Sequence, residues 1–419
     1  MKKNNHAIVV GAGIAGLGVA YFLSKEGMEV TILDKDDGKD NCSYGNAGMI
    51  VPSHIVPLAS PGIISKGLRW MLQAESPFYI RPRLDKRLFK WGWKFRQAST
   101  EKHVEESGPV LRDLLLTNRE LLIQIEEEEQ FDFGFKKNGL FNLCKTQKGL
   151  DEEVEVAEKA NDLGIPARVL SAEETREMEP SLEMDIVGST YFPKDGHLHP
   201  GSLLNKLKER MKDRAVSFRY NTNVVGLRTK NGRAQGVISA DGVHLEGSHI
   251  ILCPGAWTPE LADNIGLSLP MQAGKGYSIT LHNPKQLPEI CALLSEAKVS
   301  MTPMRGKLRF GGTMEIVGID TSINPVKLNA LKKSVCNFFP EFSMDDFEDL
   351  ETWVGLCPIS PDGLPYVGAV DRFENLFTST GHAMMGMSLG MASGQLVSQL
   401  ILHGKADFSH PLIDPNRYS

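Results

Sequence analysis

Three glycines and one aspartate near the N-terminus have the spacing of a dinucleotide-binding motif. Gly11, Gly13 and Gly16 follow a short apolar run, and Asp34 comes eighteen residues after the third glycine. The first glycine permits a tight turn, the second lets the backbone approach a pyrophosphate, and the third lets a helix pack closely on the preceding strand. The carboxylate is placed to accept hydrogen bonds from ribose hydroxyls and would repel a 2′-phosphate, which disfavours NADP.

The elements that must position these residues can be recognised around them. Residues 7–10 are expected to form a buried strand, a helical pattern follows and is ended by Gly27, and residues 29–33 are expected to form a second strand. The helix N-terminus offers N–H groups and a partial positive charge to phosphates. This unit predicts a dinucleotide site, but it does not separate NAD from FAD.

Two later segments indicate that the nucleotide is long. Residues 249–257 are expected to form a strand that runs into a Pro-Gly turn, and residues 375–382 a strand that ends in glycine. The helix expected over residues 387–402 carries glycines at four-residue intervals. Because glycine costs about 1 kcal/mol in a helix interior, these glycines predict close packing or a helix start aimed at a ligand. An NAD site would be completed earlier in the fold, so this late return favours FAD.

With these segments the chain resembles the D-amino-acid dehydrogenase group of the D-amino-acid oxidase superfamily, which consists of FAD-dependent oxidoreductases and includes glycine-oxidase-like enzymes. The resemblance covers essentially the whole chain. Its further matching segments are residues 43–50, 275–278, 308–315, 353–363, 380–382 and 416–419.

The motif and the resemblance together predict a set of residues at the cofactor. They are Gly11, Gly13, Ile14, Ala15, Gly16, Asp34, Lys35, Ser43, Asn46, Ala47, Gly48, Met49, Val224, Pro254, Gly255, Ala256, Gly381, His382, Gly386 and Met387.

The resemblance implies an α/β fold in which a Rossmann-type FAD-binding domain is interleaved with an α+β substrate domain built on a large mixed or antiparallel sheet. The FAD-binding domain would comprise residues 1–65, 197–262 and 353–419, and the substrate domain residues 66–196 and 263–352. Local patterns agree with this division. They predict a long amphipathic helix over 104–129, strands at 216–219 and 236–239, and turns at Asn221 and Asn231.

The activity that the resemblance implies is the oxidative deamination or dehydrogenation of a D-amino acid or a cyclic amino acid, such as D-proline or D-hydroxyproline. A hydride would pass from Cα to flavin N5, and the electrons would go on to a quinone or a similar acceptor. The cofactor carries this chemistry, while the protein supplies geometry and charge. Two alternatives stay open: an oxygen-using oxidase of glycine or an N-substituted glycine, and a flavin-binding partner protein without turnover.

The sequence departs from the family pattern at Cys357, where the family has the arginine that binds the substrate carboxylate. Cysteine cannot make that bidentate pair. Either another cation supplies the charge, with Arg305, Arg309 and Lys275 as candidates, or the substrate is not a simple D-amino acid. The alternative interpretation is that Cys357 is only a small buried residue with no role in binding. Related sarcosine oxidases attach their flavin through a cysteine, but a two-residue offset favours non-covalent FAD here.

Three more side chains are candidates for the catalytic site. Tyr277 is expected to bind the carboxylate, to close the pocket or simply to pack in the sheet. His382 lies where a strand meets a helix, so it is expected to contact the flavin ring or the substrate amine, although hydride transfer requires no general base. Residues 43–50 resemble the family's flavin-contacting segment. His54 follows this segment and is expected to line the site. His197 and His199 flank a turn and are expected to be structural.

Composition excludes several other classes of protein. The net charge of −6 gives no sign of nucleic-acid binding. Six cysteines without paired spacing indicate reduced thiols, and no Cys/His cluster has the spacing of a metal site. The N-terminal residues lack the core of a signal peptide and no apolar run is long enough to span a membrane, so we expect a cytoplasmic protein. The oligomeric state is left open.

Residues 66–96 contain many cations mixed with tryptophans. Such a mixture is typical of segments that lie on an anionic membrane surface. The resemblance implies a membrane quinone as electron acceptor, so a peripheral position on the inner face of the membrane is one interpretation. A solvated basic helix face with its tryptophans packed inward is the other.

Overall fold

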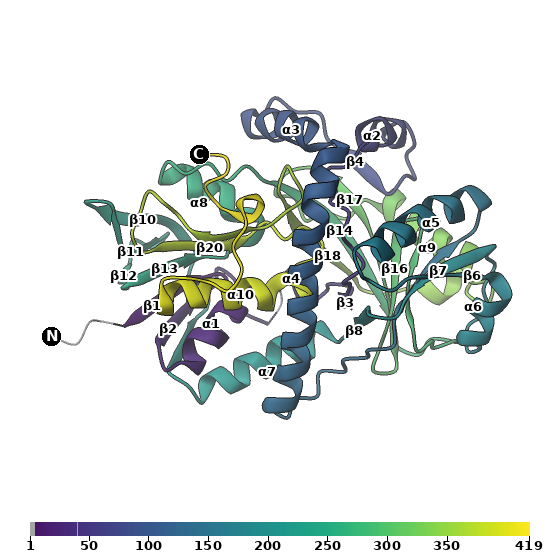
Figure 1. Ribbon diagram of the computed structural model, residues 1–419, viewed down its shortest axis with the longest axis horizontal. Coiled ribbons are helices and arrows are strands. Elements are labelled where there is room, and N and C mark those ends of the chain that lie inside the picture. The colour runs from purple at the N-terminus through teal and green to yellow at the C-terminus, as the bar shows by residue number, and fades with distance from the viewer. Residues whose placement is uncertain (1–4, 40) are drawn as a thin grey trace.

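The structure is a computed structural model that describes residues 5–39 and 41–419 (Figure 1). Helix α4 runs down the middle of the molecule, with a six-stranded sheet on one side and a nine-stranded sheet on the other. The helices are α1 (Ile14–Lys25), α2 (Ile63–Met71), α3 (Lys86–Ala98), α4 (Glu101–Glu128), α5 (Gln147–Asp162), α6 (Ala172–Met178), α7 (Pro200–Lys212), α8 (Thr258–Asn264), α9 (Pro325–Phe338) and α10 (Gly386–His403).

The six-stranded sheet contains the N-terminal motif. Its order is β19-β20-β13-β1-β2-β9, and every pair is parallel except β19 with β20. The strands are β1 (His6–Val10), β2 (Glu29–Leu33), β9 (Val216–Arg219), β13 (His249–Leu252), β19 (Tyr366–Ala369) and β20 (Leu376–Thr380). The strands expected at 7–10, 29–33, 216–219 and 249–252 are confirmed, and this sheet is the Rossmann-type part of the expected fold.

Each face of this sheet is covered by a different layer. Helices α1, α7 and α10 pack on one face together with part of α4. A three-stranded sheet covers the other face with α8. Its strands are β10 (Val224–Lys230), β11 (Arg233–Ser239) and β12 (His244–Glu246). The turns expected at Asn221 and Asn231 are confirmed by their positive φ angles of 53° and 50°.

The nine-stranded sheet follows the order β18-β14-β17-β16-β15-β5-β7-β6, and β4 pairs with β17. It is mixed, because β15 with β5 and β17 with β4 are parallel whereas the other pairs are antiparallel. The strands are β4 (Phe78–Ile80), β5 (Leu140–Cys144), β6 (Arg168–Ser171), β7 (Gly188–Phe192), β14 (Gln272–Leu281), β15 (Cys291–Leu294), β16 (Val299–Met304), β17 (Lys307–Ile316) and β18 (Thr352–Ile359). The expected large mixed sheet is therefore present.

Strand β18 bears on the domain division. It pairs with β14 along its whole length, although residues 353–359 fall in the range expected for the FAD-binding domain. The domain boundaries stay a prediction. We propose that this boundary lies after Ile359, since a cut at residue 353 would divide the sheet.

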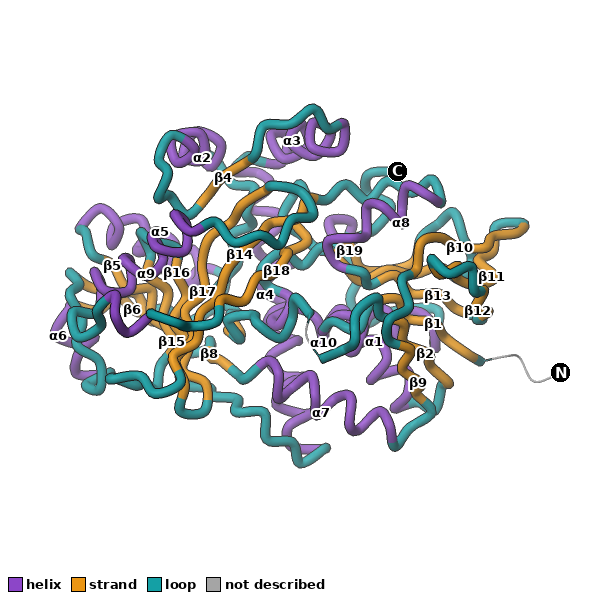
Figure 2. Tube along the Cα trace, turned by 180° about the vertical axis from the view of Figure 1, so that it is seen from behind, coloured by secondary structure: helices purple, strands orange, loops and turns teal. Residues whose placement is uncertain are grey.

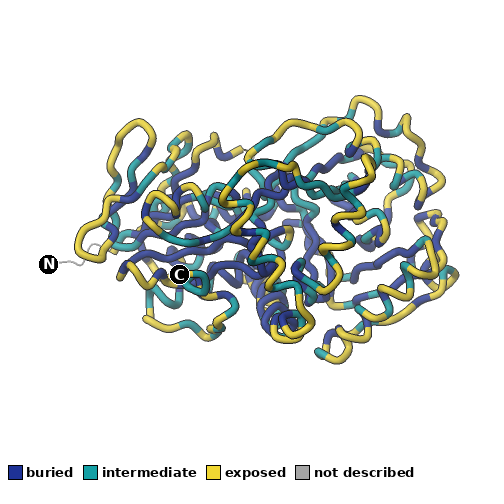
Figure 3. Tube along the Cα trace, turned by 90° about the horizontal axis from the view of Figure 1, so that it is seen from above, coloured by how far each residue is buried: buried dark blue, intermediate teal, exposed yellow. Residues whose placement is uncertain are grey.

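Helices α2 and α3 stand at one edge of the molecule, with β4 between them (Figures 1 and 2). Buried segments run through the centre of the fold, while exposed loops surround it (Figure 3). Among the helices of the described chain, none has both the length and the apolar character to cross a lipid bilayer.

The C-terminal glycine helix packs on the N-terminal glycine helix. A Cβ atom on Gly394 of α10 would lie 2.4 Å from the carbonyl carbon of Gly18 in α1, and one on Gly390 would lie 2.9 Å from Ile14. The side chain of Asn118 on α4 ties this pair to the long helix, because it donates to the Met387 carbonyl (3.0 Å) and accepts from the Met391 amide (2.9 Å). The close packing expected of these glycines is confirmed.

We expect the Gly394→Ala substitution to lower the free energy of unfolding by about 1–3 kcal/mol, the usual cost of overpacking, because the new methyl group would meet the α1 backbone. Gly92→Ala is the matched control, since a Cβ atom on this helical glycine of α3 would meet no atom within 4 Å. That substitution should stabilise by up to about 1 kcal/mol. Urea unfolding of both variants checks the claim, and equal midpoints would contradict it.

Candidate active site

The turn between β1 and α1 is built from contacts that only glycine allows. Gly11 has a φ of +107°, and a Cβ atom on it would lie 2.4 Å from the Cys253 carbonyl oxygen. A Cβ atom on Gly16 would lie 1.9 Å from the Gly11 carbonyl oxygen. The expected tight turn and close helix packing are therefore present, and the N-terminus of α1 opens toward the carboxyl edge of the parallel strands.

Asp34 holds this turn from the end of β2. Its carboxylate accepts from the amides of Ala12 (2.7 Å) and Asp36 (3.0 Å). Asn41 adds a bond from its side-chain amide to the Ala12 carbonyl (3.1 Å). The neighbouring Lys35 ammonium lies 4.3 Å from the ring centroid of Trp257. The carboxylate keeps lone pairs beyond those two bonds, so it can also accept from ribose hydroxyls.

A cavity of about 1120 Å³ begins at this turn and extends to the nine-stranded sheet and to helices α2 and α3. Most of the residues predicted at the cofactor line it. They are Gly11, Gly13, Ile14, Ala15, Asp34, Lys35, Ser43, Asn46, Ala47, Met49, Val224, Pro254, Gly255, Ala256, His382, Gly386 and Met387.

Three glycines predicted at the cofactor are absent from the cavity wall: Gly16, Gly48 and Gly381. Each is required by the backbone. A Cβ atom on Gly48, whose φ is +72°, would lie 2.2 Å from the Leu198 carbonyl oxygen, and one on Gly381, whose φ is +79°, would lie 2.9 Å from the Tyr366 ring. These glycines shape the segments that line the cavity.

Residues 43–48 are clamped by the nine-stranded sheet. Arg309 on β17 donates to the carbonyl oxygens of Tyr44 (3.1 Å) and Asn46 (2.8 Å). Ser278 on β14 donates to the Gly45 carbonyl (2.9 Å). A Cβ atom on Gly45 would lie 1.9 Å from the Trp353 indole, so this ring packs against the bare backbone. The sheet thus fixes the segment that the sequence placed at the flavin.

None of the three cations predicted to bind the substrate carboxylate lines the cavity. The Arg309 guanidinium is engaged with main-chain carbonyls. Arg305 lies in the turn between β16 and β17, where it forms an ion pair with Asp132 at 2.7 Å. The ammonium of Lys275, a residue that is only 2% exposed, donates to the Ser322 carbonyl (2.7 Å) and faces Glu315 at 3.8 Å. The structure therefore corrects all three predictions. Each side chain is held away from the cavity wall because it is bound to a residue that is distant in the sequence.

Other lysine and arginine side chains line the cavity. Among the described residues that line it, the lysines and arginines are Lys35, Arg96 and Lys298. Lys35 lies beside Asp34, whereas Arg96 is on α3 and Lys298 is in the turn between β15 and β16. Sequence reasoning missed Lys298, because a lysine in a short turn has no motif around it.

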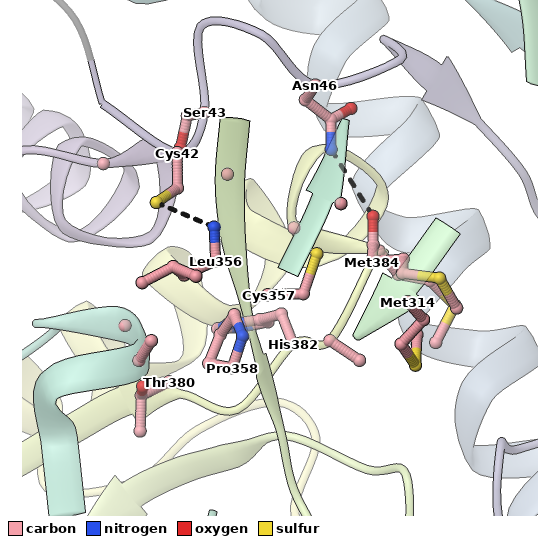
Figure 4. Close-up of a pocket in the computed structure, with 18 of the residues that line it drawn as sticks. Cys42, Ser43, Asn46, Met314, Leu356, Cys357, Pro358, Thr380, His382 and Met384 are labelled. Atoms are coloured by element: carbon pink, nitrogen blue, oxygen red, sulfur yellow. Dashed lines mark hydrogen bonds between the residues drawn. The ribbon is translucent and has the colours of Figure 1, made fainter. Parts of the chain in front are cut away.

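Cys357 lies in the cavity wall near His382, Met314 and Met384 (Figure 4). Its strand, β18, pairs with β14 so that Cys357 is opposite Gly274. Burial raises the pKa of the Cys357 thiol to about 12, so the side chain is neutral and cannot replace an arginine. Figure 4 also shows two bonds to this wall from the flavin-contacting segment and the residue just before it. The Leu356 amide donates to Cys42 Sγ (3.4 Å), and the Asn46 side-chain amide donates to the Met384 carbonyl (3.5 Å).

His382 is a neutral imidazole held from behind. Its Nε2 lies 2.9 Å from Ser393 Oγ on α10, and burial lowers the pKa of the ring to about 4. The backbone of His382 forms a bridge with Ile359 at the end of β18. The residue therefore joins the two sheets at the cavity wall, and its contact with flavin or substrate stays a prediction.

Tyr277 and His54 also line the cavity. The Tyr277 hydroxyl donates to Glu315 Oε1 (2.5 Å) and accepts from the Asn324 amide (3.0 Å), so it is engaged within the protein. Its ring forms part of the wall. Burial, together with the charge of Lys298, lowers the pKa of His54 to about 4. Across residues 5–39 and 41–419, no group of three or more His, Cys, Asp or Glu side chains is arranged to hold a metal ion.

Comparison with known proteins identifies the family. A family model described as FAD dependent oxidoreductase matches residues 6–400. The chain belongs to this DAO family. A D-amino acid dehydrogenase from Methylobacterium nodulans is 30% identical over 417 residues, which cover 98% of each chain.

Solved structures share the DAO fold. A glycine oxidase from Geobacillus kaustophilus superposes with a TM-score of 0.78 at 22% identity, covering 99% of this chain and 100% of the other. An L-proline dehydrogenase from P. horikoshii superposes with a TM-score of 0.74 at 18% identity, covering 100% and 98%.

Membership of the DAO family makes the protein an FAD-dependent oxidoreductase, and the reading as a flavin-binding protein without turnover is set aside. The cavity fits this cofactor. The glycine turn offers main-chain N–H groups at the N-terminus of α1, and Asp34 offers an acceptor for ribose. The cavity continues past residues 43–49 to the wall formed by Cys357, Met314 and His382, which is called the Cys357 wall below. Bound FAD accepts a hydride at flavin N5.

We expect the Asp34→Ala substitution to weaken FAD binding at least tenfold. It removes a charge-assisted bond to the glycine turn, and such bonds contribute about 1.5–3 kcal/mol each. Asp37→Ala is the control, because Asp37 is an exposed carboxylate on the same loop and lies outside the cavity wall. Fluorescence titration of the two apoproteins with FAD gives both dissociation constants, and equal constants would contradict the role of Asp34.

Proposed function

We propose that the protein dehydrogenates a D-amino acid or a cyclic amino acid of the D-proline or D-hydroxyproline type, by hydride transfer from Cα to flavin N5. The observation that carries this proposal is the continuous cavity between Asp34 and the Cys357 wall, in a chain related over its whole length to a D-amino acid dehydrogenase. Hydride transfer requires the substrate carbon to sit beside the flavin ring, and the far end of the cavity is the place for it.

The walls at that end favour an apolar substrate with one charged group. Phe78 and Ile80 on β4 and Trp91 on α3 line the cavity, and Met314 and Cys357 line it from β17 and β18. Such walls disfavour an ammonium group and therefore favour the neutral amine from which a hydride can leave. A small saturated ring would present apolar surface to these walls.

Lys298 and Arg96 are the cations available to the substrate carboxylate. They support an amino acid as substrate even though Cys357 occupies the position of the family arginine. A lysine binds a carboxylate as a point charge without the bidentate geometry of arginine. We therefore propose that the carboxylate is held from the turn between β15 and β16 or from α3.

The FAD is proposed to be bound non-covalently. Burial raises the pKa of Cys357 to about 12, so this thiol lacks the thiolate that attachment needs. Acid precipitation should leave the yellow flavin in the supernatant, and a yellow pellet would refute the proposal.

Anaerobic bleaching of the flavin by a panel of amines tests the function. We expect D-proline, D-hydroxyproline or another D-amino acid to reduce the bound flavin, and sarcosine and glycine to be poor substrates. With the best substrate in air, a dehydrogenase should produce little peroxide and an oxidase a stoichiometric amount. Failure of every amine to bleach the flavin would overturn the proposal, and stoichiometric peroxide would favour the oxygen-using oxidase.

We expect Lys298→Gln to raise KM for the amino-acid substrate about tenfold or more, because a charge-assisted hydrogen bond contributes about 1.5–3 kcal/mol. The corresponding amine without a carboxylate should be unaffected. Arg305→Gln is the matched control, since this arginine pairs with Asp132 outside the cavity. Equal KM values for wild type and Lys298→Gln would assign the carboxylate to Arg96 or to no cation.

For the electron acceptor, we propose that helices α2 and α3 rest on an anionic membrane surface and deliver electrons to a quinone. Large apolar side chains are exposed on α2, on α3 and in the segment that joins them, notably Leu72 (88%), Leu84 (100%) and Trp93 (61%). Trp91, in contrast, is buried and its indole N–H donates to the Ile359 carbonyl (2.9 Å). Of the two tryptophans on α3, one thus packs inward and the other faces solvent among cations, which supports contact with lipid.

Flotation with anionic liposomes tests this surface. A variant with Glu at positions 86, 87 and 90 should bind about a hundredfold less well, given about 1 kcal/mol for each basic residue near the surface. Glu at positions 212, 230 and 405, which are exposed lysines outside α2 and α3, is the charge-matched control. Equal flotation of the two variants would exclude docking through α2 and α3.

A further inference from the structure

A chain of three side chains leads from the cavity wall into the interior. His54 lines the cavity, and its Nδ1 lies 3.3 Å from Ser53 Oγ. The Ser53 hydroxyl donates to Asp195 Oδ2 (2.5 Å), and the Ser53 amide donates to Asp195 Oδ1 (3.0 Å). Asp195 lies between β7 and β8 (Gly196–His197) and is 1% exposed. Asp195 itself is absent from the cavity wall.

The hydrogen-bond pattern assigns the tautomer of His54. A serine hydroxyl has one proton, and this one is directed at the Asp195 carboxylate. Ser53 Oγ can then only accept from His54, so the imidazole carries its proton on Nδ1. Its Nε2 is left with a lone pair, and a neutral imidazole in a cavity wall is a proton acceptor.

Burial of both groups and the charge of Lys298 favour passing a proton from His54 to Asp195. Lys298, in the turn between β15 and β16, is the charged group that faces His54, and it lowers the pKa of the ring together with burial. Burial raises the pKa of Asp195 to about 7, although the hydrogen bonds from Ser53 and the charge of Arg119 on α4 lower it, and the Cys291 thiol on β15 is a titratable group beside it. A proton that reaches His54 is therefore held better by Asp195.

We propose that His54, Ser53 and Asp195 form a relay that takes the proton of the substrate ammonium group before hydride transfer. The proposal rests on the amine dehydrogenation proposed above. The substrate N–H bond breaks as His54 Nε2 accepts the proton. The Nδ1 proton passes to Ser53 Oγ, and the Ser53 proton passes to Asp195. The products are a neutral amine, a neutral carboxyl group on Asp195 and His54 in its other tautomer, so charge and protons balance. His54 is the catalytic residue, and Ser53 and Asp195 act through it.

The relay predicts how the rate of flavin reduction depends on pH. Below about pH 7 Asp195 is already protonated and cannot accept, so the rate of flavin reduction in the wild type should rise through that pH as the carboxylate forms. At about pH 10 the substrate amine loses its proton to water without help. The contribution of the relay should therefore be large near neutral pH and absent at high pH.

Anaerobic stopped-flow reduction of the holoenzyme across this pH range tests the relay. In Asp195→Asn and Ser53→Ala the rate at neutral pH should fall about a hundredfold, within the usual range for a lost proton acceptor. Both should regain the wild-type rate near pH 10. A variant that is only structurally damaged would stay slow at every pH, and that result would overturn the relay, as would an unchanged pH profile.

Infrared difference spectra recorded during a pH titration without substrate give a second readout. A carboxyl C=O band should disappear as pH rises through about 7 in the wild type, and it should be missing in Asp195→Asn. It should persist in Asp213→Asn, which changes an exposed aspartate at the end of α7. A band retained by Asp195→Asn would overturn the relay. If no amine reduces the wild-type flavin, the proposed function itself fails, whereas reduction with an unaltered profile in Asp195→Asn refutes the relay alone.

Discussion

Close backbone contacts at the glycines around α1 leave no room for side chains, and these contacts determine how the rest of the fold is arranged. Gly11 lies against the Cys253 carbonyl, Gly16 against Gly11, and Gly18 against Gly394. Each contact is closer than a Cβ atom would permit, so α1 is fixed between its own strand and α10. The N-terminus of α1 can then open onto a cavity whose walls come from segments spread over the whole chain.

The two sheets divide the work at this cavity. The parallel sheet supplies the glycine turn and Asp34 at its carboxyl edge, where such sheets bind nucleotides. The mixed sheet supplies Arg309, Ser278 and Trp353, which hold the flavin-contacting segment by its backbone. The family's carboxylate-binding position is occupied by a neutral thiol at Cys357, and the cations that we propose for charge recognition lie in a turn and on α3.

Much of the fold could be predicted from the sequence because its signals are local. The strand, glycine turn, helix and second strand of residues 7–33 follow from spacing alone, and so does the glycine interface of α10. The carboxylate-binding candidates failed for the opposite reason. Arg309 reaches Tyr44 and Asn46 across more than 260 positions of sequence, and Lys275 is buried against Glu315 on a neighbouring strand. No periodicity reveals such partners. Asp195 and Lys298 were missed because each lies in a short turn, where residue type alone does not indicate burial or a cavity.

We propose that the substrate carbon gives its hydride to flavin N5 at the end of the cavity where Cys357 lies. The rate of anaerobic flavin reduction by a saturating amine substrate, compared with the same substrate carrying deuterium at Cα, tests this most directly. We expect the deuterated substrate to reduce the flavin several times more slowly, because the Cα–H bond breaks as the flavin is reduced. Equal rates for the two substrates, when chemistry limits reduction, would contradict it.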